Sequence, residues 1–130
     1  MRQPVQRNVV SFPSGSLPAA IYKIVPASLW EEAERAGRFE GAPVDEADGF
    51  IHLSTAEQVR ETARRHFAGQ GGLLLVTVDA DALGDALRFE PSRGGDLFPH
   101  LYGPMPLAAV LSAEPLPIGP DGAHAFPPLG

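Results

Sequence analysis

The stretch LLLVTVD at residues 73–79 is a run of apolar and β-branched residues that follows the turn signal Gly71-Gly72. A strand with one wet face alternates between apolar and polar residues, whereas a continuous apolar run is typical of a strand covered on both faces. We therefore predict a central strand at 73–79, with the rest of the fold arranged around it.

Upstream of this strand, the chain carries a second β-type segment and a helical signal. The segment AIYKIV at 20–25 is predicted to be the first core strand. Ser28 and Glu31 have the spacing of a capping box, which predicts a helix over 29–36 that ends before Gly37. We expect the buried stripe of this helix to consist of Leu29, Ala33 and Ala36.

Residues 38–49 lack apolar periodicity and are predicted to form a loop that leads into the strand FIHLS at 50–54. Ser54 and Glu57 have the spacing of a second capping box. Apolar residues then recur at helical spacing, which predicts a second helix that ends at Gly69; these residues are Ala56, Val59, Ala63 and Phe67.

Downstream of the central strand, the pattern changes to short segments. We predict a helical turn over 79–87, a brief strand at 88–90, an irregular loop over 91–106 and a final strand at 108–116. Two main helices among several strands that do not alternate regularly with them indicate the α+β class.

Glycine and proline set the expected domain limits, because 15 of the 28 residues of these two types lie after position 90. Residues 1–18 have no periodicity and are expected to be a flexible extension. The Pro/Gly-rich stretch 117–130 is expected to be a C-terminal tail. The predicted domain is thus the single unit 19–116.

Composition excludes several classes of function. The chain has no cysteine, which removes disulfide frameworks, thiolate zinc sites and cysteine nucleophiles. Its net charge of −6 argues against a module that binds nucleic acid through bulk charge. Because there is no membrane-spanning run and no secretory signal, we expect no membrane partner and a cytoplasmic location.

The FIHLS segment holds the first candidate site. In a strand, Phe50, His52 and Ser54 share one face, while Ile51 and Leu53 point to the other. If the aliphatic face is core, His52 faces a cleft beside an aromatic ring. The alternative is a buried histidine that only the backbone satisfies.

The stretch EPSRGGDLFPHLYGPM at 90–105 holds the second candidate site, with Arg93, His100 and Tyr102 between glycines and prolines. Arg93 beside two glycines could bind a phosphate or a carboxylate in bidentate fashion, or it could pair with Asp96 while the aromatic residues merely pack. An extended segment through Pro99 is expected only at a sheet edge or outside a sheet.

A metal site is an open alternative. His52 and His100 could bind a metal together with a carboxylate such as Asp45 or Asp48. No ligand spacing resembles a known metal signature, so we expect no metal cofactor.

Three segments together resemble one known family over residues 20–116. They are IYKIVPASLWEEAERAGRFEGAPVDEADGFIHLSTAEQV, the mid-chain TARRHFAG and RFEPSRGGDLFPHLYGPMPLAAV. The chain resembles the bacterial family known as domain of unknown function 952, which is grouped with the ADP-ribosyltransferase-like superfamily. That grouping implies a split α+β fold in which NAD, as substrate, lies between two small antiparallel sheets.

The resemblance also implies roles for residues. FIHLS is similar to the strand with a central histidine in RNA 2′-phosphotransferases, so His52 would contact a ribose hydroxyl or a phosphate. Tyr22 would line the cleft, and the residues of the second site, Arg93, His100 and Tyr102, would close it. Ser54, on the same face of its strand as His52, is a further candidate ligand-binding residue. Two hypotheses follow: a transferase that binds NAD or another nucleotide with His52 and His100 as catalytic residues, or a non-catalytic module that binds a phosphorylated metabolite or a protein.

Overall fold

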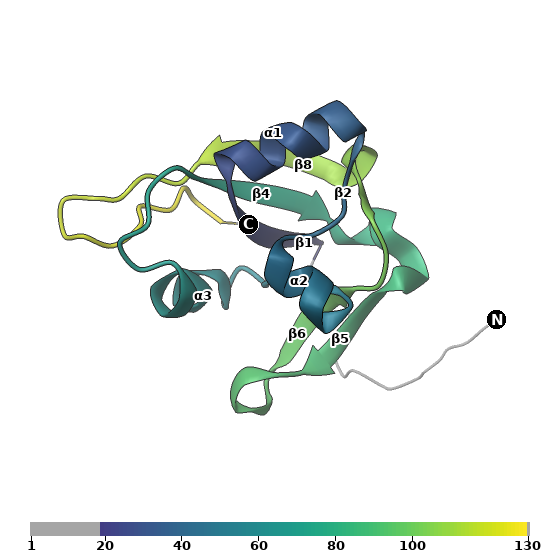
Figure 1. Cartoon of the computed structure of the whole chain (residues 1–130). Coiled ribbons are helices and arrows are strands. Elements are labelled where there is room, and N and C mark those ends of the chain that lie inside the picture. Colours follow the sequence, from purple (N-terminus) through teal and green to yellow (C-terminus); the bar gives the residue numbers. More distant parts are fainter. Residues whose placement is uncertain (1–18, 130) are drawn as a thin grey trace.

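The computed structural model describes residues 19–129, apart from the side chain of Arg93, so the predicted extension 1–18 lies outside the described residues. The fold is mixed α/β, with small antiparallel sheets and few helices (Figure 1). The helices are α1 (Ala27–Ala36), α2 (Pro43–Asp48) and α3 (Val59–His66), with the short 3-10 segments η2 (Ala80–Ala86), η3 (Arg93–Gly95) and η4 (Leu107–Ala109). The strands are β1 (Ala20–Pro26), β2 (Arg38–Phe39), β3 (Ile51–His52), β4 (Leu73–Asp79), β5 (Leu87–Pro91), β6 (Leu97–Leu101), β7 (Met105–Pro106) and β8 (Val110–Pro115).

The predicted central strand is confirmed: β4 lies between β1 and β8 in a three-stranded antiparallel sheet. Its side chains alternate between two hydrophobic clusters. Val76 and Val78 pack in the cluster that contains α1, whereas Leu73 and Leu75 pack in the cluster that contains α3. Both faces of β4 are therefore covered, which explains why its sequence is apolar at nearly every position.

The first helix forms where it is predicted, but its cap and its buried face differ from the prediction. Helix α1 begins at Ala27 directly after Pro26 and has no side-chain cap, so the expected capping box of Ser28 and Glu31 is wrong. Of the predicted stripe, Ala33 is buried, Leu29 is partly buried against the core and Ala36 is exposed, while Trp30, which was not predicted, is buried. The reason is the contact with the next strand, in which the Trp30 ring packs against Phe39.

The second capping box is also wrong, because Ser54 is used elsewhere. The backbone of Ser54 pairs with Tyr22 of β1, and its hydroxyl lies 2.9 Å from the hydroxyl of Thr62. The helix begins only at Val59, after a turn that Gln58 closes by accepting a hydrogen bond from Thr55 N.

The predicted loop over 38–49 contains the short elements β2 and α2. A helix of six residues is too short to display a periodic pattern, which is why the sequence concealed α2. Gly41 before it is required by its backbone, since its φ is +112° and an added Cβ would lie 2.9 Å from Asp45 Cβ.

The predicted irregular loop over 91–106 contains β6, which is the middle strand of the sheet β3-β6-β5. The expectation that Pro99 would confine this segment to a sheet edge or keep it out of a sheet is wrong. Pro99 O accepts a hydrogen bond from Leu53 N at 3.0 Å, and proline has no N–H to return one, so regular pairing of β3 stops at His52. A short partner strand lets a proline occupy the middle of this sheet.

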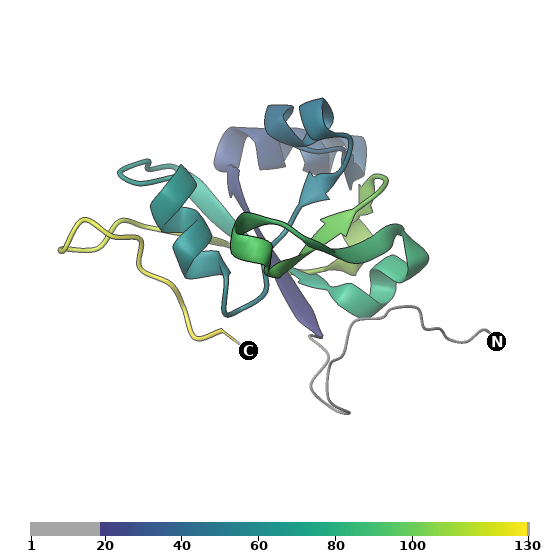
Figure 2. The same cartoon turned by 90° about the horizontal axis from the view of Figure 1, so that it is seen from below.

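The C-terminal stretch 117–129 contains no helix but packs on the domain. Phe126 and Leu129 contact the hydrophobic cluster beneath α3, and His124 Nε2 lies 2.8 Å from Gln70 O. The molecule seen from below shows this stretch running alongside α3 (Figure 2). The limits 19 and 116 of the predicted domain stay a prediction.

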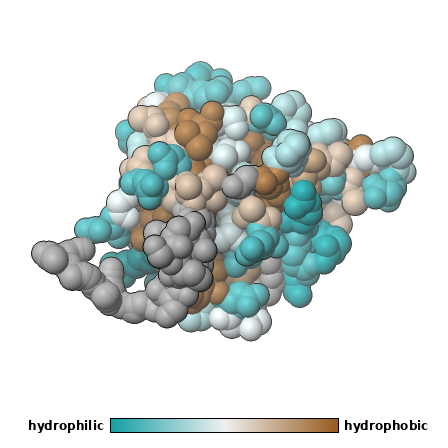
Figure 3. Space-filling view, turned by 180° about the vertical axis from the view of Figure 1, so that it is seen from behind, coloured by the Kyte–Doolittle hydropathy of each residue, from teal (hydrophilic) through white to brown (hydrophobic). Residues whose placement is uncertain are grey.

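The surface mixes apolar and hydrophilic side chains. The space-filling view from behind shows apolar residues interspersed with hydrophilic ones (Figure 3). The large apolar side chains that are exposed within residues 19–129 come from separate elements: Val44, Tyr102, Leu111 and Ile118. Among the described helices, none has the length and apolar character needed to cross a bilayer.

Candidate functional site

His52 and His100 are direct cross-strand partners in the pairing of β3 with β6. Paired residues of antiparallel strands project to the same face, so the two imidazole rings lie close together, with their centroids 5.7 Å apart. Ile51 and Leu53 point the other way and are buried, which is the division of faces predicted from FIHLS. The histidines that the sequence placed in separate stretches therefore belong to one surface.

Both rings line a cavity of about 730 Å³. This volume falls in the range of about 300–1,000 Å³ that small-molecule sites occupy. The walls come from β1, α2, β3, α3 and β6, with Ser92 at the end of the β5–β6 hairpin. Tyr22, Phe67 and Phe98 supply aromatic surface to the cavity.

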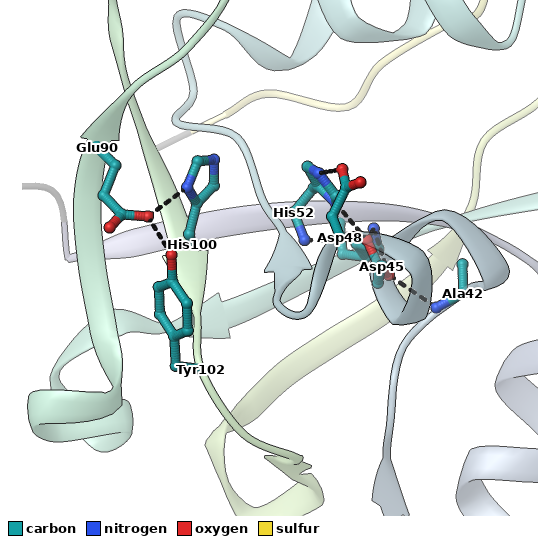
Figure 4. Close-up of polar contacts among 8 residues, drawn as sticks. Ala42, Asp45, Asp48, His52, Glu90, His100 and Tyr102 are labelled. Atoms are coloured by element: carbon teal, nitrogen blue, oxygen red, sulfur yellow. Dashed lines mark hydrogen bonds and ion pairs between the residues drawn. The ribbon is translucent and has the colours of Figure 1, made fainter.

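His52 lies between two carboxylates of helix α2 (Figure 4). Its Nδ1 is 2.6 Å from Asp45 Oδ1, and its Nε2 is 2.8 Å from Asp48 Oδ2. Because an ionised carboxylate only accepts hydrogen bonds, the ring makes both bonds at once when each nitrogen carries a proton. Asp45 thus fixes the orientation of the ring. Asp48, which lines the cavity, is the hydrogen-bond partner of Nε2.

Asp45 is the buried centre of this half of the site, with 1% of its side chain exposed. Its oxygens lie 3.0 and 3.1 Å from Lys23 Nζ, and it accepts hydrogen bonds from the backbone N–H groups of Ala42 and His52. Burial opposes its ionisation, but the bond with the His52 ring and the charge of Lys23 outweigh burial and lower the pKa of Asp45 to about 2.

Lys23 is the matching buried cation. Desolvation lowers the pKa of Lys23, and the charge and hydrogen bond of Asp45 oppose that shift. The ion pair joins β1 to α2, so it ties the helix that bears Asp45 and Asp48 to the central sheet.

His100 has a carboxylate partner of its own on β5. Its Nδ1 is 2.7 Å from Glu90 Oε1, so Nδ1 carries the proton and a neutral ring has its lone pair on Nε2. The Tyr102 hydroxyl donates to the same Glu90 oxygen at 2.7 Å (Figure 4). The Phe50 ring stacks on His100 with centroids 4.1 Å apart, which holds the imidazole from one side.

The Glu90 network changes two pKa values. Burial opposes the ionisation of Glu90, but the hydrogen bonds of His100 and Tyr102 outweigh it and lower the pKa of Glu90. The bond to Glu90 raises the pKa of Tyr102 above its usual value. Both shifts favour an ionised Glu90 beside a protonated hydroxyl, which is the state that orients His100.

The other predicted site residues are divided between the cavity and its surroundings. Tyr22 and Ser54 line the cavity, and the Ser54 hydroxyl is engaged with Thr62. Tyr102 is outside the cavity lining and acts on His100 through Glu90. Arg93 lies in η3, and its side chain lies outside the described part of the structure, so its pairing with Asp96 or with a ligand stays a prediction.

Sequence reasoning missed Lys23 and gave Asp45 and Asp48 a place only as metal ligands. A signal for Lys23 was present, because a lysine in the middle of the apolar strand AIYKIV must be buried and requires a counter-charge. Its partner could not be identified from sequence, since Asp45 is one of several acidic residues in a stretch with no pattern. Within residues 19–129, no group of three or more histidine and carboxylate side chains is arranged to hold a metal ion.

Comparisons with known proteins give one matching family model and the solved structures of one similar protein. Residues 24–113 match the family model described as Protein of unknown function (DUF952). The chain is similar to the crystal structure of protein CC0527 from Caulobacter crescentus, with 48% identity and a TM-score of 0.78 over 82% of this chain and 93% of that chain. It is also similar to the solution NMR structure of CC0527, with 48% identity and a TM-score of 0.73 over 81% of this chain and 90% of that chain. No curated protein matches it.

Proposed function

The chain belongs to the DUF952 family of proteins of unknown function, and from the geometry of its cavity we propose that it binds NAD or a related nucleotide and acts on it as an ADP-ribosyltransferase-like transferase. The observation that carries the proposal is the pair His52 and His100. Their ring centroids are 5.7 Å apart, and both rings lie on one wall of a cavity of about 730 Å³.

The residues of the cavity suit the parts of such a ligand. Aromatic side chains can stack on a planar base or a nicotinamide ring, and Tyr22 and Phe98 lie in the lining. Imidazole groups held by carboxylates can exchange hydrogen bonds with ribose hydroxyls, as His52 and His100 are held by Asp45 and Glu90. The two small sheets that meet at the cavity suit the split fold implied by the superfamily.

The reaction also has requirements that these groups meet. Cleavage of the nicotinamide–ribose bond passes through an oxocarbenium-like state, so positioned hydrogen bonds and negative charge stabilise the transition state more than the substrate. Asp48 on the cavity wall supplies negative charge, and His100 Nε2 supplies an acceptor for a hydroxyl proton. In this proposal His100 is the base, and His52 positions the ribose.

A second candidate, a module that binds a phosphorylated metabolite without turning it over, is favoured by one observation. Asp48 Oδ2 lies 2.8 Å from His52 Nε2, so the nitrogen of His52 that faces the cavity is already occupied. A ligand that leaves this bond in place would be bound and not transformed.

Turnover separates the two functions. The purified full chain is titrated calorimetrically with NAD⁺ and ADP-ribose, and then incubated with NAD⁺ and with 2′-phosphorylated RNA while nicotinamide and phosphate release are followed. We expect binding by the wild type, weaker binding by His52→Ala and His100→Ala, and no change for the control His124→Ala, which lies outside the cavity lining. Binding without release would support the module, and the absence of binding to NAD⁺ and ADP-ribose would overturn the proposed transferase.

A further inference from the structure

Lys23 is a buried amine that the proposed functions leave unused. It is the only lysine in the sequence, whereas arginine occurs nine times. Its side chain is 8% exposed, and it lines the cavity of about 730 Å³. Arginine stays charged in proteins, whereas a buried lysine loses its proton readily and can serve as a Schiff-base nucleophile. The chain thus places its one nucleophilic side-chain amine in the wall of its cavity.

The Lys23 amine shares a carboxylate with the His52 ring. Asp45 Oδ1 is 3.1 Å from Lys23 Nζ, and the same oxygen is 2.6 Å from His52 Nδ1 (Figure 4). Desolvation lowers the pKa of Lys23 against the opposing charge and hydrogen bond of Asp45. A lowered pKa increases the fraction of neutral amine, which is the form that attacks a carbonyl carbon.

Asp45 restricts the chemistry that is open to the Lys23 amine. Asp45 is 1% exposed and has a pKa of about 2, so it stays ionised and requires a positive charge on the lysine nitrogen. Acylation or carbamylation of the amine would remove that charge and leave a buried carboxylate without its cation. Condensation with an aldehyde keeps the charge, because the product is a protonated imine.

We propose that Lys23 forms a protonated imine with a small aromatic aldehyde bound in the cavity, and that Asp45 is the counter-ion of this imine. The neutral amine attacks the carbonyl carbon and a C–N bond forms. The carbonyl oxygen takes two of the three ammonium protons and leaves as water. An ammonium and an aldehyde thus give an iminium and water, so the reaction needs no oxidant and releases no net proton.

The other residues of the cavity favour an aromatic body for the aldehyde. Tyr22, Phe67 and Phe98 supply aromatic surface, and Ile24 and Leu53 supply aliphatic surface. An aromatic ring buries its apolar area against these side chains and stacks on the rings. A short aldehyde such as acetaldehyde forms the same imine but has no ring to place there. This inference goes beyond the proposed nucleotide function and does not rest on it.

The test is reductive trapping of the imine on the full chain. The protein is incubated with benzaldehyde and sodium cyanoborohydride, which reduces an imine to a stable secondary amine, in native buffer and in urea that unfolds the chain. Peptide mass mapping locates the added benzyl group and separates reaction at Lys23 from reaction at the α-amino group. Arg35→Lys places an exposed lysine on α1 as an internal reference, and Lys23→Arg keeps the buried charge without the amine.

We expect native Lys23 to be labelled about tenfold faster than position 35 of Arg35→Lys, because the bound aldehyde is held beside the amine. The rate at Lys23 should saturate with benzaldehyde, and the rate at position 35 should rise linearly. Half-saturation with benzaldehyde should come at about tenfold lower concentration than with acetaldehyde, because only benzaldehyde buries a ring. The side-chain label should be lost in Lys23→Arg.

Three results would overturn the inference in whole or in part. If Lys23 is labelled in urea but not in the native chain, it is an inert ion-pair partner and the imine is excluded. Native labelling that neither saturates nor exceeds the rate at position 35 would show an ordinary accessible amine. Equal half-saturation with the two aldehydes would overturn the aromatic class. The comparison of native with unfolded wild type uses no variant, so it decides the proposal whether or not Lys23→Arg folds.

Discussion

Replacement of Asp45 by asparagine should destabilise the protein more than replacement of any exposed carboxylate. The side chain is 1% exposed, and its oxygens contact Lys23 Nζ, His52 Nδ1 and two backbone N–H groups. Asp45→Asn keeps the shape of the group but leaves the Lys23 ammonium buried without a counter-charge. Loss of one partner of a buried ion pair costs about 3–5 kcal/mol.

Lowering the pH should remove part of the stabilisation that ionised Asp45 gives to the wild-type protein. The pKa of Asp45 is lowered from its usual 3.8 to about 2 in the folded protein, so its ionisation favours folding above about pH 4. This contribution is lost as the pH falls from about 4 toward 2. A shift of this size corresponds to about 2 kcal/mol. Because Asp45→Asn cannot titrate at this position, its stability should fall less over the same pH interval.

Urea unfolding followed by circular dichroism at pH 7, 4 and 3 measures both effects. Glu46→Gln on the same helix is the control, and its free energy of unfolding should stay within about 0.5 kcal/mol of the wild type. Lys23→Met should cost less than Asp45→Asn, because Asp45 keeps its bonds to His52 and Ala42. Two results would refute the assigned role of this carboxylate. One is a decrease of less than about 1 kcal/mol in the free energy of unfolding of Asp45→Asn at pH 7. The other is a decrease between pH 7 and pH 3 that is as large in Asp45→Asn as in the wild type.

Three further predictions concern other parts of the molecule. Truncation after Pro117 should lower the free energy of unfolding by about 2–3 kcal/mol, because Phe126 and Leu129 pack on the second hydrophobic cluster; an unchanged urea midpoint would show that the stretch is a dispensable tail. Trp30→Phe should cost less than about 2 kcal/mol in the same assay, since it also removes a buried indole N–H that has no partner within the described residues; a cost above about 3 kcal/mol would contradict this. Glu90→Gln should lower the pKa of Tyr102 toward its usual value. Ultraviolet titration would detect this change as ionisation of one tyrosine at a lower pH than in the wild type, and an unchanged titration curve would argue against the Glu90 bond.

The elements that could be predicted from the sequence are those with a strong local signal. The strand at 73–79 was predictable because a continuous apolar run requires cover on both faces, and the end of the first helix was predictable because Gly37 is a stop signal. The strand β6 could not be predicted because it contains Pro99. A proline fits in this middle strand only because the neighbouring strand β3 is short and does not need a hydrogen bond from position 99. Tertiary contacts likewise decided the helix starts, since Ser54 pairs with Tyr22 instead of capping α3.

The candidate site was predictable in part for the same reason. His52 and His100 could be singled out because each stands in an apolar or aromatic stretch, but their pairing depends on the register of β3 with β6. The carboxylates that orient them come from α2 and β5, and nothing in the local sequence links Asp45 to His52 or Glu90 to His100. Cross-strand and helix–strand proximity of this kind is a property of the fold and is not encoded in local spacing.

The most direct test of the nucleotide site is an NMR titration of the histidine rings with NAD⁺. His52 and His100 line the cavity, and His124 lies outside its lining, so the chain contains its own control. The proposed function predicts saturable shifts of the ring signals of His52 and His100 and an unchanged signal for His124. If the signals of His52 and His100 stay unchanged with NAD⁺ and with ADP-ribose at millimolar concentration, the cavity is not a nucleotide site.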